Sequence, residues 1–378
     1  MFDYETLRLI WWLLIGILLV GFAITDGFDM GSGIISLIIG KTDDDRRIIV
    51  NSMAPHWEGN QVWLVTAGGA LFAAWPQVYS VAFSGFYTAI LITLMALFFR
   101  PVGFDYRSKI ATPKWRSNWD KLLFVGSVVP PIVFGVAFGN LFLGVPFSFD
   151  ELMRARFTTG FFNLLSPFAL LCGLVSLLMI ITQGATWLGM KTDDELKQRI
   201  IKFGGWSALS TTLLFAIAGI WVSQLDGYSI VNMTNFNADS NPLAKTVILN
   251  AGGWLSNYHL YPWMISMPLI GLLSPLATWW CLRNQKDGFA FLFSSLTLLG
   301  IIMTAGCSLF PFIIPSVLSP NYSLTIWDAT SSYKTLSVMT IVAAIIVPII
   351  LCYTSWTYYK MFGRLNKQFI DNNSHSLY

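Results

Sequence analysis

Long apolar runs separated by short polar segments fill almost the whole chain. A helix that crosses a bilayer needs roughly 20 mainly apolar residues. Runs of this kind predict helices over residues 7–39, 78–99, 122–142, 161–183, 204–224, 262–282, 289–314 and 336–359. A shorter apolar run that ends at Trp75 is ambiguous. Hydropathy alone therefore leaves eight or nine helices open.

Basic residues decide between these two counts. With a ninth helix over residues 58–75, 18 of the 23 Lys and Arg residues fall on one side of the membrane. Without it, Lys41, Arg46 and Arg47 change side and the split weakens to 16 against 7. Because Lys and Arg concentrate in cytoplasmic loops, we expect about nine helices, with the N-terminus periplasmic and the C-terminus cytoplasmic.

Composition supports a membrane protein and excludes several other classes. Charged residues make up only 11% of the chain and hydrophobic residues 55%, whereas soluble domains carry about 25% charged residues. The net charge of +3 is small and its basic residues are scattered, so no nucleic acid is expected as a partner. We predict one all-α integral membrane domain over residues 1–378, with ordered outer caps over residues 226–261 and 315–337.

Two acids interrupt the first apolar run. As one helix, residues 9–40 would be about 48 Å long at 1.5 Å per residue, against a hydrocarbon core of about 30 Å. Either this helix projects into the cytoplasm, or Asp26 and Asp29 lie inside the membrane. Three residues apart, both acids share one helix face.

The predicted topology places Asp26, Asp29, His56, Glu58 and Arg100 near the cytoplasmic boundary. Such a cluster is either an ion-pair network that orients helices or a proton path. For Arg100 the structural role is favoured, with the side chain reaching towards water. For Asp29 and Glu58 a proton path is favoured, because acids beside apolar helix interiors are costly.

Histidine is scarce, which limits metal and haem chemistry. The chain has three, His56, His259 and His375, and only His56 is predicted near membrane depth. Haem iron usually needs a His, Met or Cys ligand, so a chain that carries several haems would need more. The four cysteines show no metal or redox spacing, and no metal site is expected. Asp328, in an outer loop, is predicted to cap a helix start.

Several blocks of sequence resemble subunit II of the cytochrome bd ubiquinol oxidases. The similarity runs from end to end. The blocks are Asp3–Trp12, Thr25–Met30, Ala54–Trp63, Gly68–Pro76, Phe98–Pro101, Gly103–Arg107, Leu324–Ser332 and Lys360–Arg364.

This resemblance implies a respiratory complex of the bacterial inner membrane that oxidises a quinol and reduces dioxygen to water. Subunit I of such complexes carries haems b558, b595 and d and the quinol-oxidising loop. The present chain would pair with subunit I, often beside a single-helix accessory subunit, and would hold no catalytic residue of its own. The resemblance leaves ubiquinol or menaquinol open, and a bound ubiquinone in this chain is also implied.

The resemblance also assigns residues. Glu58 matches the proton-path acid of the His-Trp-acid-Gly-Asn-Gln block, where some members have Asp. Asp26 and Asp29 match the acidic pair of the first helix. Candidate quinone-binding residues at one depth are His56, Gln61 and Arg100, whose donors suit quinone carbonyls.

Two other functions remain open from the residues. A proton- or ion-coupled secondary transporter could use Asp29 and Glu58, although no inverted repeat of the kind common in transporters is visible. A scaffold, in which all polar groups are structural, is the second alternative.

Overall fold

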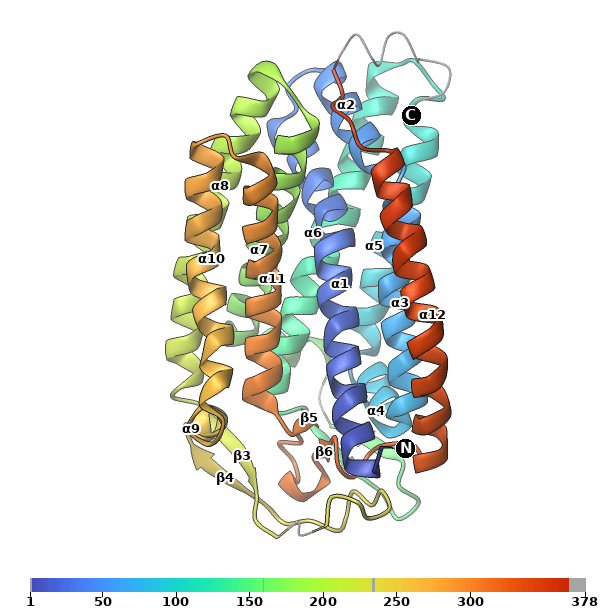
Figure 1. The fold of residues 1–378 in the computed structure, drawn as a ribbon, viewed down its shortest axis with the longest axis vertical. Coiled ribbons are helices and arrows are strands. Elements are labelled where there is room, and N and C mark those ends of the chain that lie inside the picture. Colours follow the sequence, from blue (N-terminus) through green and yellow to red (C-terminus); the bar gives the residue numbers. More distant parts are fainter. Residues whose placement is uncertain (1, 159, 233–234, 367–378) are drawn as a thin grey trace.

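The computed structural model describes residues 2–158, 160–232 and 235–366. Long helices lie side by side in an upright bundle (Figure 1). Eight of the helices in the described residues are long and apolar enough to cross a membrane, which confirms the all-α membrane prediction. They are α1 (Tyr4–Ile39), α5 (Tyr87–Tyr106), α6 (Pro113–Leu143), α7 (Pro167–Lys191), α8 (Asp194–Val222), α10 (Ser266–Arg283, preceded by the 3-10 turn Pro262–Ile265), α11 (Asp287–Leu309) and α12 (Tyr333–Lys360).

The ninth predicted helix is also present. Helix α3 (Trp57–Ala74) packs along α1 and has a polar first turn, and it is not one of the eight. Helix α1 begins, and α12 ends, at opposite ends of the bundle (Figure 1), as an odd number of passes requires. We call the end that holds the short helix α2 (Asp43–Met53) the α2 end. The α2 end is the predicted cytoplasmic side, and this orientation stays a prediction.

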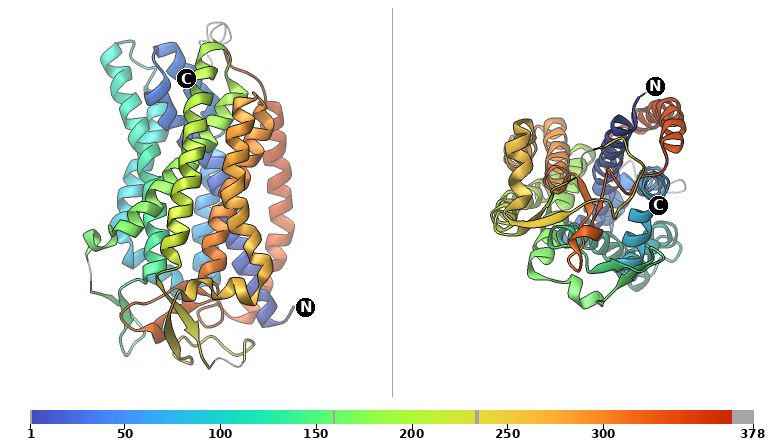
Figure 2. Two further views of the ribbon diagram at one scale, coloured as in Figure 1. Left: turned by 90° about the vertical axis from the view of Figure 1, so that its left-hand side faces the viewer. Right: turned by 90° about the horizontal axis from the view of Figure 1, so that it is seen from below.

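The opposite end, here the hairpin end, carries three antiparallel two-stranded ribbons (Figures 1 and 2). Arg8 shows how its loops are held: it is fully buried and donates to Phe236 O at 2.6 Å, Ala238 O at 3.0 Å and Thr330 Oγ1 at 2.9 Å. The outer loops are therefore ordered by the first helix, as expected. The paired strands are β1 (Phe147–Phe149) with β2 (Ala155–Phe157), β3 (Asp226–Ile230) with β4 (Val247–Ala251), and β5 (Phe312–Ile314) with β6 (Leu324–Thr325).

Several helix ends differ from the prediction for local reasons. Residues 78–99 belong to two helices, α4 (Pro76–Gly85) and α5, which meet at Phe86. The predicted helix over 161–183 begins only at Pro167, because the Ser166 side chain accepts from Ala169 N and caps it there. Residues 312–314 form a strand instead of the end of a helix, because Pro311 lacks the N–H that a helix interior needs.

Helix α1 is central because its small residues allow close approach. A Cβ atom built on Gly184 of α7 would lie 2.3 Å from the Gly31 carbonyl carbon of α1. The two backbones therefore touch, and only glycine fits at this crossing. Small residues at helix interfaces are the usual device for packing helices in membranes.

We expect Gly184→Ala to push α1 from α7 and destabilise the protein by about 1–3 kcal/mol, the range for overpacking a core. Gly219→Ala is the matched control, because Gly219 also lies in a helix but nothing is within 4 Å of its would-be Cβ. The thermal melting point of the purified protein measures both. Equal melting points for the two variants would contradict the tight crossing.

Candidate functional site

Asp26 and Arg100 form a buried ion pair that links α1 to α5. Arg100 Nη1 donates to Asp26 Oδ2 at 2.9 Å, and Nη2 donates to Oδ1 at 2.7 Å. Neither side chain is more than 1% exposed. Bidentate pairs of this kind are strong and fix geometry. The ion-pair role expected of Arg100 is present, but the guanidinium points into the bundle and does not reach towards water.

Asp29 lies one turn further along α1 and shares the same guanidinium only loosely. Its Oδ2 is 4.0 Å from Arg100 Nη2 and accepts a hydrogen bond from Asn60 Nδ2 at 2.8 Å. Its Oδ1 is buried and has no hydrogen-bond partner among the described residues. Such an atom in a native structure calls for an explanation. Two fully buried carboxyl groups thus face a single guanidinium, and Asp29 keeps the unused oxygen.

Asn60 connects this acid pair to the last helix. Its Oδ1 accepts a hydrogen bond from the Tyr358 hydroxyl of α12. The Tyr358 ring stacks on His56 with centroids 4.5 Å apart, and Phe28 stacks on Trp187 at 4.1 Å. We call Phe28, His56, Trp187 and Tyr358 the aromatic cluster. It lies towards the α2 end and encloses the link between α12 and Asp29.

His56 sits in the connection between α2 and α3. Burial, assisted by the positive charge of Lys191, lowers the pKa of His56 to about 4. The imidazole is therefore neutral near pH 7. One ring face is covered by Tyr358, and Trp187 meets the ring edge-on at 5.9 Å. This histidine is a packed member of the aromatic cluster.

The structure separates Glu58 from the acids of α1. Glu58 is exposed and Asn60 is buried, because residues two apart on a helix point in nearly opposite directions. Glu58 therefore lies on the outward face of α3, while Asn60 faces Asp29. Gln61 is partly exposed. No described contact joins Gln61, His56 and Arg100, so the quinone role assigned to these three stays a prediction.

Sequence reasoning missed Asn60 and Tyr358 as site residues. Asn60 had a signal, since it stands in the same block as His56 and Glu58 and is a polar residue on the inward face of a membrane helix. Tyr358 had none, because it lies 298 residues from its partner Asn60. Only the packing of α12 against α3 brings the two together.

Asp328 is a cap, but not of a helix. Its Oδ1 accepts from Thr325 N at 3.0 Å, and its Oδ2 lies 2.7 Å from Lys245 Nζ, with both side chains fully buried. Burial raises the pKa of Asp328 although Lys245 opposes the shift. The N-cap of α12 is Ser332, whose side chain accepts from Thr335 N. The predicted position at a helix start was wrong; Asp328 fixes the turn before it.

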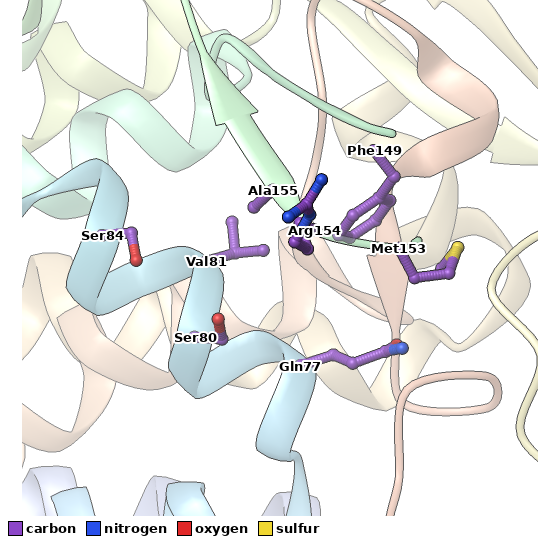
Figure 3. A pocket seen from close by; sticks show the side chains of 8 residues that line it. All are labelled: Gln77, Ser80, Val81, Ser84, Phe149, Met153, Arg154 and Ala155. Atoms are coloured by element: carbon purple, nitrogen blue, oxygen red, sulfur yellow. The ribbon is translucent and has the colours of Figure 1, made fainter. Parts of the chain in front are cut away.

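A cavity of about 270 Å³ lies far from these acids, between α4 and the β1–β2 hairpin (Figure 3). Its lining includes Gln77, Ser80 and Arg154. None of the predicted site residues lines it. In addition, no group of three metal-ligating side chains occurs within the described residues.

Comparison with known proteins decides the family. Residues 7–361 match the sequence profile of the family described as cytochrome bd terminal oxidase subunit II. The chain belongs to this family. It is 57% identical to cytochrome bd-I ubiquinol oxidase subunit 2 of Escherichia coli K12, over 100% of both chains. It is 30% identical to cytochrome bd ubiquinol oxidase subunit 2 of Bacillus subtilis, over 94% of this chain and 96% of that one.

A solved structure shares the fold. A chain of the bd oxidase from Geobacillus thermodenitrificans superimposes with a TM-score of 0.67 at 17% identity, covering 95% of this chain and 99% of that chain. As a member of the subunit II family, the protein is a subunit of a terminal oxidase, an oxidoreductase complex. Because the family matches cover the chain, the transporter alternative is not favoured.

Replacing Arg100 by Gln leaves Asp26 buried without its cation, so we expect a loss of about 3–5 kcal/mol of stability or failure to assemble. Arg154→Gln is the control, since Arg154 pairs with Asp150 while 67% exposed, and exposed pairs contribute about 0–1 kcal/mol. Combining Arg100→Gln with Asp26→Asn is expected to restore part of the loss. Melting of the purified complex measures all three, and a native melting point for Arg100→Gln would contradict the role of the pair.

Proposed function

We propose that the chain is subunit II of a bd-type quinol:dioxygen oxidoreductase of the aerobic respiratory chain in the bacterial inner membrane. It would pair with a haem-bearing subunit I, beside a small accessory subunit, and would help to supply protons for the reduction of dioxygen to water. The observation that carries this proposal is the buried acid pair of α1 in a chain that matches the family over its length. Ubiquinol is the favoured donor, because that word stands in the names of the Escherichia coli and Bacillus subtilis relatives.

The histidines of the described residues do not suit a haem. His56 is buried, with a stacked tyrosine on one face and a tryptophan beside its edge. His259 is exposed at the hairpin end, and His375 lies outside the described residues. This poor fit supports placing haems b558, b595 and d on subunit I, and no step is assigned to a haem in this chain.

Electroneutrality explains how the acid pair could hold a proton. Two carboxyl groups and one guanidinium are neutral together when they hold a single proton, and buried sites strongly favour neutrality. Asp26 takes two hydrogen bonds from Arg100, so both of its oxygens already have a donor. The proton therefore belongs on Asp29, whose Oδ1 has no described partner.

Glu58 is suited to a position nearer to subunit I. It is the first of a row of exposed residues along one face of α3. The others are Val62, Val65, Gly69 and Phe72. A carboxylate against lipid is costly, and glycine on such a face favours contact with another helix. Helix α12 lies beside α3 (Figure 1), and its buried residues are Leu336 and Ser337. We assign the face of α3 and α12 to subunit I.

Asp29→Asn removes the proton-holding carboxyl and is expected to slow quinol-driven oxygen consumption by about tenfold or more, because a positioned acid or base contributes at least that much. Asp226→Asn is the matched control, since Asp226 is exposed in β3. Glu58→Gln is also expected to slow proton uptake. Its control is Glu151→Gln, which changes another exposed glutamate.

Normal oxygen consumption and proton uptake in both Asp29→Asn and Glu58→Gln would contradict the proton-supply role and favour the scaffold function.

Haem content tests the division between the subunits. Expressed without subunit I, the chain is expected to purify without haem absorption bands, because His56, the histidine inside the bundle, is covered by Tyr358 and Trp187. The complete complex should show them. The measurement is a reduced-minus-oxidised spectrum of each preparation, and haem bound to the single chain in equal amount would contradict the assignment.

A further inference from the structure

The residues that follow α12 cross the α2 end and bind the connection between α7 and α8. We call Met361–Leu365 the strap. Lys191 Nζ donates to Met361 O at 3.0 Å, and Leu365 N donates to Lys191 O at 2.7 Å. Both ends of the strap are thus held by one residue, the last of α7.

Arg364 ties the middle of the strap to two more helices. Its Nη1 lies 2.6 Å from Asp193 Oδ1 at the start of α8, and its Nη2 lies 3.5 Å from Asp287 Oδ2 at the start of α11. The Leu365 side chain packs against the same core that contains Phe28 and Trp187. The strap therefore closes over the aromatic cluster and is not a loose extension of α12.

Lys191 is unusual among the groups at this end. It is only 4% exposed, and its ammonium lies 4.8 Å from the Trp187 ring centre and 5.2 Å from that of Phe362. Its described partners are these rings and the Met361 carbonyl, and none of them is a carboxylate. Burying an ammonium without a carboxylate is costly. The hydrogen bond that this buried ammonium makes is to the Met361 carbonyl of the strap.

The strap matters because, near its end, α12 is held by the contacts of Tyr358 and by the strap. The buried residues of α12 are Leu336 and Ser337, both within its first five residues. Tyr358, in the last turn, stands one turn before Met361 and hydrogen-bonds to Asn60. Whatever fixes Met361 therefore also fixes the height and rotation of the Tyr358 hydroxyl.

We propose that Lys191 is a positioning residue: by holding the strap it keeps Tyr358 on Asn60, which in turn keeps the Asn60 amide directed at Asp29. This inference rests on the proposed role of Asp29 in proton supply. Lys191 carries no proton itself in this scheme. It determines whether the hydrogen-bonded chain from α12 to Asp29 is formed.

The test uses the assembled complex and the variants Lys191→Met, Lys191→Arg, Tyr358→Phe and Arg364→Gln. Lys286→Met is the matched control, because Lys286 also lies over a tryptophan ring, 4.8 Å from Trp280, but is exposed, and Trp280 lies outside the strap. Hydrogen exchange of peptides covering Leu365 reports the strap. Turnover, the KM for quinol and the pH profile of oxygen consumption report the site.

In Lys191→Met we expect the Leu365 amide to exchange about tenfold faster, as the loss of a hydrogen-bonded anchor implies. Turnover should fall by about tenfold, because a small misplacement of a group at the site slows a reaction by at least this much. The KM for quinol should stay unchanged, and the pH profile should be like that of Tyr358→Phe. The variant that combines Lys191→Met with Tyr358→Phe should turn over no more slowly than Tyr358→Phe alone. Lys191→Arg should restore the rate, and Arg364→Gln, at an exposed residue, should reproduce the effect if Lys191→Met does not assemble.

A freed strap with unchanged turnover and pH profile would overturn the positioning role. So would a protected Leu365 amide in both Lys191→Met and Arg364→Gln. If Asp29→Asn has normal proton uptake while Lys191→Met both frees the strap and slows turnover, the proposed function of Asp29 fails but the strap remains a determinant of activity. The two failures are therefore distinguishable.

Discussion

The bidentate pair between Asp26 and Arg100 is the interaction on which the site depends. An unpaired charge at this depth would be very costly, so each partner requires the other. The pair fixes α5 relative to α1 and occupies two of the donors of Arg100. Asp29 then accepts its hydrogen bond from Asn60, and Asn60 accepts one from Tyr358. One ion pair thus arranges four helices around the Asp29 carboxyl.

Close packing of small residues keeps this pair away from lipid. The α1 and α7 backbones touch at Gly31 and Gly184, and α10 meets α11 in the same way at Gly271 and Gly300. In a membrane the hydrophobic effect does not drive helices together, so such contacts supply the attraction through dispersion forces. The acids of α1 can be fully buried because the neighbouring helices approach this closely.

The two ends of the bundle solve different problems. At the hairpin end, Arg8 and the pair of Lys245 with Asp328 hold irregular loops in place with hydrogen bonds to neighbouring carbonyls and hydroxyls. At the α2 end, ion pairs and the aromatic cluster surround the hydrogen bonds that join Tyr358 to Asn60 and Asn60 to Asp29. Glu58 lies on the exposed face of the first turn of α3, and Asn60 lies on its buried face.

The sequence by itself was enough to predict a membrane protein, the positions of its helices and its family. A 20-residue apolar run has few alternatives to a membrane helix, and charge placement predicted the helix that the structure contains as α3. Several helix ends differ from the prediction because of local interactions that hydropathy does not reflect, such as the cap at Ser166 and the missing N–H of Pro311. The sequence also identified Asp26, Asp29 and Arg100, because charges inside an apolar run or directly at its end are conspicuous. Only tertiary structure decided which acid takes the arginine, which face Glu58 occupies and that Tyr358 reaches Asn60. These outcomes depend on helix rotation and on contacts between residues hundreds of positions apart, which no local pattern encodes.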